Sequence, residues 1–160
     1  MNDILISIPK PPPIEVENAV LAAMMTTPAT VDPCAEILKP SDFAHIQCGV
    51  LFSVIVARHQ SSLPVDPVSI TAHLFQTGTI DSIGGAGTIA EISAACPDPG
   101  AAKSYAKEIQ QASKRRQMAR IGAELARSAS EDGEEYEDLS LIHISEPTRR
   151  TERSRMPSSA

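Results

Sequence analysis

Four side chains of the kind that bind zinc occur in the first half of the chain: Cys34, His45, Cys48 and His59. Cysteine and histidine are the usual zinc ligands, and the three-residue spacing of His45 and Cys48 puts them on one face of a helix. His59, however, lies about 21 Å beyond His45 along a continuous helix, whereas every ligand must come within roughly 2.3 Å of one ion. We therefore predict buried thiols and surface histidines, and no metal site.

Two further patterns were considered for substrate chemistry. Gly84, Gly85 and Gly87 precede a predicted helix and could cradle a phosphate, but the Lys-Ser/Thr of a P-loop is missing and no strand precedes them, which favours a turn. No Ser, Cys or carboxylate is set beside a base in a recognisable catalytic pattern. We expect no catalytic residue and no cofactor site in this chain, and a small metal-dependent enzyme is disfavoured because it would need stoichiometric zinc.

Composition and charge narrow the class of protein. The chain has 160 residues, 42% of them apolar and 21% charged, with a formal net charge of −6. An acidic chain has no overall attraction for nucleic acid or for an anionic membrane. The longest apolar stretch is about half of what spans a bilayer, and three cysteines form no disulfide framework. We expect a cytoplasmic protein without membrane contact.

Proline, glycine and cap residues divide the chain into six predicted helices and no strand. The prolines up to Pro13 indicate an extended arm, because proline lacks an amide donor. Apolar residues repeat with helical spacing from there on, and the segment from Phe43 to Gln60 is the predicted central core helix. The helices are expected to begin at Ile14, at Asp32-Pro33, after Ser41 and Asp42, at Asp66-Pro67 with Gly78 as C-cap, after Gly84–Gly87, and at Asp98-Pro99.

The sequence thus predicts an all-α protein, a small globular helical bundle followed by one long last helix. The predicted boundaries are an extended arm over 1–13, a globular subdomain over 14–98, the last helix over 99–131, which the family resemblance given below makes the first arm of a projecting helical hairpin, an acidic loop over 132–138 and a foreign tail over 139–160.

The last predicted helix changes its apolar side. With 100° of rotation per residue, its early apolar residues cluster within about 40° of Tyr105, and its later ones near about 160° to 220°. The early set is Tyr105, Ile109 and Ala112, and the late set is Met118, Ile121 and Leu125. One body cannot cover both sides, so we expect the helix to dock up to about Ser113 and then to face another partner. The alternative is a break in the helix near Ser113.

The same helix carries the one basic cluster of the chain, with Arg116, Arg120 and Arg127 on the side where Tyr105 lies. Such a face could contact phosphates. Acidic residues follow from Glu131 onward and no aromatic residue is interleaved for base stacking, so a solvated or inter-subunit salt-bridging face is favoured.

The C-terminal segment has a different origin. LSLIHISEPTR, Leu139 to Arg149, looks like the in-frame translation of a transposase sequencing adapter, and SRMPSSA, Ser154 to Ala160, looks like the far end of the same adapter. The residues between them fit a sample index. Foreign segments are left out of fold reasoning, so no function is assigned to residues 139–160.

From Pro12 to about Ser130 the order of signals resembles the N-terminal domain of the DnaB-type bacterial replicative helicase. The matching stretches are PPPIEVENAVLAAMM, AEILKPSDF, LFSVIVA, LPVDPVSITAHL, GTIDSIGG and SYAKEIQQASKRRQM. The chain departs from that family's pattern at Ala44, Cys48 and Pro67. These positions lie in the core or in helix caps, so the departures affect packing details more than the assignment to the family.

The resemblance implies an all-α subdomain followed by a helical hairpin. In that family the hairpins pair between subunits and help to build a hexameric ring, the N-terminal collar receives primase, and a helicase loader is a further expected partner. ATP and Mg²⁺ would act in a RecA-like motor, which also contacts DNA, and the P-loop of that motor does not occur in this sequence. We expect a fragment of a helicase gene that supplies assembly and partner docking without catalysis.

The residues expected to carry this role are those of the two apolar sets. Tyr105, Ile109 and Ala112 would anchor the hairpin stem, whereas Met118, Ile121 and Leu125 would contact a second arm or a neighbouring subunit. The alternative is a freestanding helical adaptor or phage regulator that captures a helicase or primase. A P-loop ATPase encoded beyond Asp138 would favour the first interpretation, and a natural stop there would favour the second.

Overall fold

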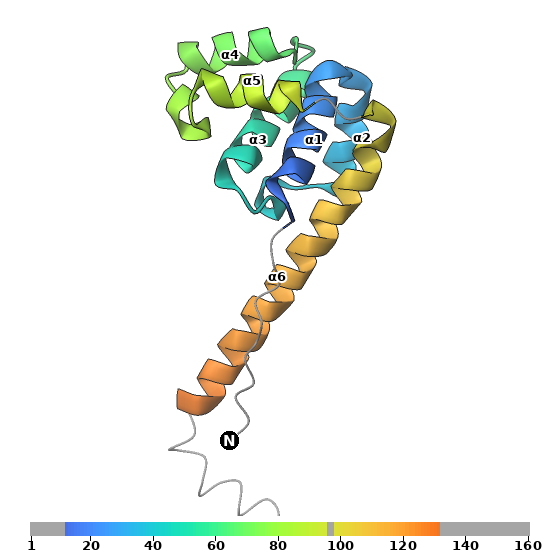
Figure 1. Ribbon diagram of the computed structural model, residues 1–160. Coiled ribbons are helices and arrows are strands. Elements are labelled where there is room, and N and C mark those ends of the chain that lie inside the picture. Colours follow the sequence, from blue (N-terminus) through green and yellow to red (C-terminus); the bar gives the residue numbers. More distant parts are fainter. Residues whose placement is uncertain (1–11, 96–97, 132–160) are drawn as a thin grey trace, which may run out of the picture. The chain divides into compact units, whose positions relative to one another are not determined.

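A computed structural model describes residues 12–95 and 98–131, and these form helices and turns with no strand (Figure 1). The predicted all-α class is confirmed. The loop at 132–138, the tail at 139–160 and all but the last two residues of the predicted arm lie outside the described residues. The elements in chain order are α1 Ile14–Thr26, η1 Pro28–Thr30, α2 Val31–Ile37, η2 Pro40–Asp42, α3 Ile46–Gln60, α4 Pro67–Gln76, η3 Ile80–Ile83, α5 Ala86–Ala94, η4 Pro99–Ala101 and α6 Ala102–Glu131.

The most completely buried helix is α1, and not the predicted core helix that became α3. Every residue from Val20 to Met25 is at most 2% exposed. The two alanines in this run, Ala22 and Ala23, let neighbouring helices approach closely, and α1 packs against both α3 and α5. The run from Val20 to Met25 is apolar on every side, which suits a stretch of helix that other helices surround, and α1 lies among the other helices of the body (Figure 1).

The start and the end of α4 follow the predicted signals. Asp66 caps the helix by accepting hydrogen bonds from the backbone N–H of Val68 and Ser69 at 3.1 and 3.0 Å, and Pro67 occupies the first turn. Hydrogen bonds from Ser69 lower the pKa of Asp66 below its ordinary value. Gly78 has φ +66°, the left-handed conformation that glycine tolerates best. The predicted cap, first-turn proline and terminating glycine are confirmed.

Two other helix starts were predicted wrongly. Asp32 is not an N-cap, because α2 begins one residue earlier, at Val31. The predicted 43–60 helix begins only at Ile46, since Pro40 and Asp42 form the separate turn η2, and Asp42 accepts a hydrogen bond from the backbone N–H of Lys39 at 2.8 Å. Phe43 therefore precedes α3, and its ring packs against that of Phe52 with centroids 5.1 Å apart.

The last helix is continuous. A short turn, η4, leads into α6, which has no break at Ser113 or at Gly122. The chain divides into two units between Ala119 and Arg120, a point within α6. The predicted domain boundaries stay a prediction. No helix within 12–95 or 98–131 combines the length and the apolar character needed to cross a membrane.

Candidate functional site

The first half of α6 binds the body through a narrow row of small and apolar side chains. Ala102, Ala106, Ile109 and Ser113 are each at most 2% exposed. Their spacing of four, three and four residues keeps them on one side of a helix. Small side chains in this row let the helix backbone lie close to the body, so the docking face continues for about three turns.

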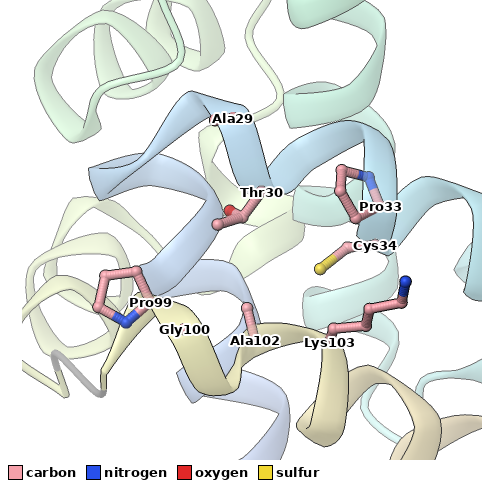
Figure 2. Close-up of a pocket in the computed structure, with 8 residues that line it drawn as sticks. All are labelled: Ala29, Thr30, Pro33, Cys34, Pro99, Gly100, Ala102 and Lys103. Carbon is pink, nitrogen blue, oxygen red and sulfur yellow. The ribbon is translucent and has the colours of Figure 1, made fainter.

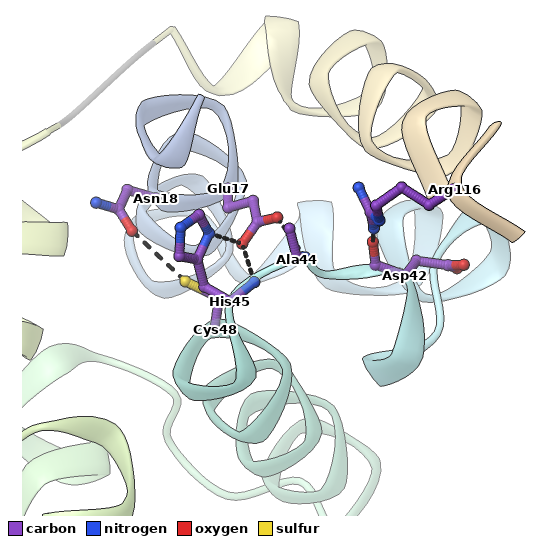
Figure 3. A network of polar contacts seen from close by, with 7 residues as sticks. All are labelled: Glu17, Asn18, Asp42, Ala44, His45, Cys48 and Arg116. Atoms are coloured by element: carbon purple, nitrogen blue, oxygen red, sulfur yellow. Dashed lines mark hydrogen bonds and ion pairs between the residues drawn. The ribbon is translucent and has the colours of Figure 1, made fainter. Parts of the chain in front are cut away.

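Polar side chains fix the register of this half against the segment from α2 to η2. The Gln110 side-chain amide donates to the carbonyl oxygen of Ile37 at 2.6 Å, and the Ser113 hydroxyl donates to Asp42 Oδ1 at 2.7 Å. The guanidinium of Arg116 donates to the carbonyl oxygen of Asp42 (Figure 3). The other carboxylate oxygen of Asp42, Oδ2, accepts a hydrogen bond from the backbone N–H of Lys39, so Asp42 closes the turn η2 with one oxygen and binds α6 with the other.

The predicted stem residues lie on or beside this face. Ile109 is fully buried, and Tyr105 packs partly buried against the core. Ala112 is half-buried at the edge. Because Ala102, Ala106 and Ser113 lie between about 60° and 100° on the Tyr105 scale, the buried face is rotated from the predicted one toward the small residues.

The late apolar residues are exposed. Met118, Ile121 and Leu125 have exposed fractions of 71%, 56% and 66%. We call these three residues the α6 stripe. Its spacing of three and four residues gives one continuous apolar surface over two turns of helix. Exposed apolar side chains grouped in this way are typical of interaction sites.

The three arginines of the predicted basic face have different surroundings. Arg116 is half-buried and bound to Asp42, and its second terminal nitrogen, Nη1, is buried without a hydrogen-bond partner among the described residues. Arg120 and Arg127 are exposed. Arg116 is therefore a docking residue of α6, which sequence spacing could not reveal because its partner lies 74 residues earlier.

A second polar network, which local sequence patterns do not predict, joins α1 to the start of α3. Glu17 is fully buried, and its carboxylate accepts hydrogen bonds from the backbone N–H of Ala44 at 2.7 Å and of His45 at 3.3 Å (Figure 3). The His45 ring contributes a third contact, with Nδ1 3.0 Å from the carboxylate. One feature of the sequence points to the burial of Glu17: it lies three and four residues before Val20 and Leu21, and therefore on the same buried side of α1.

The cysteines and histidines of the considered zinc site have other partners. Burial raises the pKa of the Cys34 thiol to about 11. Burial, and then the negative charge of Glu17, raise the pKa of Cys48 to about 12, and the Cys48 thiol donates to Asn18 Oδ1 at 3.7 Å. Such thiols stay protonated at neutral pH, which does not suit a metal ligand. Within the described part of the chain, no group of three side chains is placed to bind one metal ion. His59 Nε2 instead lies 3.3 Å from Asp32 Oδ1.

The glycine segment forms the predicted turn. Gly84 and Gly85 have φ +89° and +91°, and Gly85 directly precedes α5. A Cβ on Gly84 would lie 2.8 Å from the hydroxyl of Thr88, so the close packing of the turn also favours glycine. Both torsions explain the glycines without a ligand.

A cavity of about 220 Å³ lies between the start of α6 and the η1–α2 corner (Figure 2). Cys34 is in its wall and Lys103 at its side, and the remaining lining side chains are small or apolar. A protonated thiol is a weak nucleophile.

Comparison with known proteins finds relatives of this chain in one family. The family described as DnaB-like helicase N terminal domain matches residues 10–111. The chain is 31% identical over 140 residues to the replicative DNA helicase DnaB of Geobacillus stearothermophilus, covering 88% of this chain and 30% of that protein. It is 28% identical to the replicative DNA helicase DnaC of Bacillus subtilis, covering 87% of this chain and 31% of that protein. The chain thus spans about a third of the length of these relatives.

Solved structures show the same fold. The N-terminal domain of DnaB helicase from Mycobacterium tuberculosis matches with a TM-score of 0.72 at 23% identity, covering 84% of this chain and 96% of that one. The N-terminal domain of DnaB helicase from Helicobacter pylori, described with its interactions with primase, matches with a TM-score of 0.62 at 21% identity, covering 72% and 90%.

Proposed function

Because the chain belongs to the DnaB-like helicase N-terminal domain family, we propose that it is the assembly and primase-docking domain of a replicative DNA helicase and performs no catalysis itself. The whole protein would unwind DNA at replication forks in the cytoplasm, with ATP and Mg²⁺ acting in a motor domain that also contacts DNA. The likeness of this chain to proteins of about three times its matched length supports this division of labour.

The observation that carries the assembly role is the contrast along α6. Its first half is bound to the body through Ile109, Ser113 and Arg116. The α6 stripe is left exposed, although an exposed stripe of this size is costly in water. A helix that is anchored at one end and presents an apolar surface at the other is suited to joining subunits, as paired copies within a hexameric ring.

The primase-docking role rests on the Helicobacter pylori relative, whose structure is described with primase. A helicase loader is a further proposed partner, because the resemblance to the helicase family implies one. Neither partner needs a catalytic group in this chain.

The test compares self-association and primase binding in one set of proteins. We expect the chain to self-associate with rising concentration in sedimentation velocity and to bind its cognate primase saturably in isothermal titration calorimetry. Leu125→Glu should weaken self-association and leave primase binding intact. A chain that stays monomeric and takes up no primase would contradict the proposal, and primase binding without a motor encoded after Asp138 would favour the freestanding adaptor.

A further inference from the structure

An apolar groove of about 430 Å³ lies between the turn η2 and the outer side of α3, and none of its lining side chains is charged. Phe43, Ile46 and Val50 supply its apolar walls. The two elements meet closely, because a Cβ on Gly49 would lie 2.5 Å from the carbonyl oxygen of Pro40. We call this surface the η2–α3 groove.

The η2–α3 groove is held in shape by the body and is open to solvent. Phe43 is fixed by its contact with the ring of Phe52, and it is only 7% exposed. Ile46, in contrast, is 80% exposed. The hydroxyl of Ser53, which also lines the groove, donates to the carbonyl oxygen of Gly49 at 2.9 Å, so it does not call for a polar ligand. Such a preformed apolar groove suits an apolar ligand.

The N-terminal arm contains an apolar segment that the proposed function does not use. Residues 4–8 read Ile-Leu-Ile-Ser-Ile, between the charged residues Asp3 and Lys10. Alternate residues of an extended chain share one side, so Ile4, Ile6 and Ile8 would present a single apolar edge. We call residues 4–8 the arm segment.

The arm leaves the body close to the η2–α3 groove. Pro12, the first described residue, is buried. Five residues later, in the first turns of α1, the carboxylate of Glu17 accepts hydrogen bonds from the backbone N–H of Ala44 and His45 (Figure 3). His45 directly precedes Ile46, which lines the groove. Glu17 therefore joins the start of α1 to the wall of the groove.

The length of the arm matches this position. Its prolines form a semi-rigid spacer of about 3.1 Å per residue, which puts Ile8 about 16 Å and Ile4 about 28 Å from Pro13 at full extension. From Ile46 to Ser53 the groove follows α3 for about 10 Å. A second apolar groove, between α4 and α5, lies toward the far end of α1 (Figure 1), so the η2–α3 groove is the nearer one.

We propose that the η2–α3 groove binds the arm segment of the same chain. A short tether gives an effective concentration of the order of millimolar, which favours a chain's own arm over that of a second copy. The apolar edge of the arm segment covers Ile46 and Val50, which removes apolar surface from water on both partners. This inference is independent of the proposed assembly function, since neither surface belongs to α6.

The test places one fluorescent reporter in the arm. The chain contains no tryptophan, so Ile6→Trp in the full chain gives a single emission signal. We expect this emission to lie to the blue of that of the same protein unfolded in urea, and to be less quenched by acrylamide. Adding Ile46→Glu should lower the ratio of bound to free arm at least about tenfold, as the loss of a central contact does.

Val68→Glu serves as the matched control, because Val68 is an apolar residue that is 78% exposed and lines the α4–α5 groove instead. It should leave the emission of the Ile6→Trp protein unchanged. Thermal unfolding followed by circular dichroism checks the fold of each variant. If Ile46→Glu lowers stability, benzoyl-phenylalanine at position 46 replaces it, and irradiation should crosslink position 46 to residues 4–8.

Three results would overturn the inference. The first is an Ile6→Trp emission equal to that of the unfolded protein. The second is an emission that Ile46→Glu leaves unchanged, or that Val68→Glu shifts equally. The third is an emission that depends on protein concentration, or crosslinks that join isotopically labelled to unlabelled chains, since both would assign the arm to a second copy. None of these results bears on the assembly function, which Leu125→Glu tests separately.

Discussion

The two halves of α6 differ in which side chains they bury. The half that ends at Ser113 buries a polar residue, whereas the half that begins at Met118 exposes apolar ones. Ser113 is 1% exposed, whereas Leu125 is 66% exposed. Burial along this helix therefore follows the register of the docking face and the presence of a hydrogen-bond partner, and not the hydrophobicity of each residue. The difference shows which part of the helix serves the fold of its own chain and which part is available to another.

The largest expected effect comes from truncating one large apolar residue in each half. Ile109→Ala should lower the free energy of unfolding by about 2–5 kcal/mol, because it opens a cavity under a fully buried side chain. Leu125→Ala should change it by no more than about 0.5 kcal/mol at concentrations where the chain is monomeric. Urea denaturation measures both, and equal losses would remove the distinction between the halves.

A smaller effect should follow from removing one serine in each half. Ser113→Ala leaves the buried Asp42 Oδ1 without its 2.7 Å hydrogen bond, at a cost of about 1–3 kcal/mol. Ser128→Ala is the matched control, since its hydroxyl donates only to the carbonyl oxygen of Glu124 in its own helix, at 3.0 Å. The control should stay within about 0.5 kcal/mol. A Ser113→Ala protein as stable as the control would show that the Asp42 contact does not hold α6.

The last expected effect is on the pH dependence of stability, and it concerns two thiols of the body, those of Cys34 and Cys48, and not α6. Cys34 and Cys48 have pKa values raised to about 11 and about 12 from an ordinary value of 9.0. Between pH 9.0 and the raised pKa values, the unfolded chain has lost thiol protons that the folded chain keeps. The stability that these groups contribute is therefore fully present below pH 9.0 and falls as the pH rises through about 11. Urea denaturation should show this decline, and a Cys34→Ala/Cys48→Ala protein should show a weaker one. An equal decline in both proteins would mean that the thiols do not cause it.

Local signals in the sequence were sufficient for the number and order of the α-helices and for the change of face in α6, although two helix starts were displaced. The cap at Asp66, the glycine at position 78 and the apolar spacing around Ile109 all depend on residues within one or two turns. The buried Glu17 and the Asp42–Ser113 pair could not be predicted, because their partners lie 27 and 71 residues away in sequence. Hydrogen bonds over such separations depend on how helices pack.

Phe75 shows the other limit of the sequence pattern. It lies close to Ile70 and Leu74 in the sequence, and all three side chains are apolar. The structure buries Ile70 and Leu74 and leaves Phe75 60% exposed. Helical spacing identifies an apolar surface, but it does not say whether the same chain or a second copy covers it.

Hydrogen exchange measured by mass spectrometry over a range of protein concentrations tests the central claim most directly. Amides of residues 102–113 should exchange slowly at every concentration, because the body covers them. Amides of residues 118–127 should exchange quickly in dilute protein and become protected as the concentration rises. Residues 118–127 protected equally at all concentrations, or never protected at any, would contradict the account that the α6 stripe joins one copy to the next.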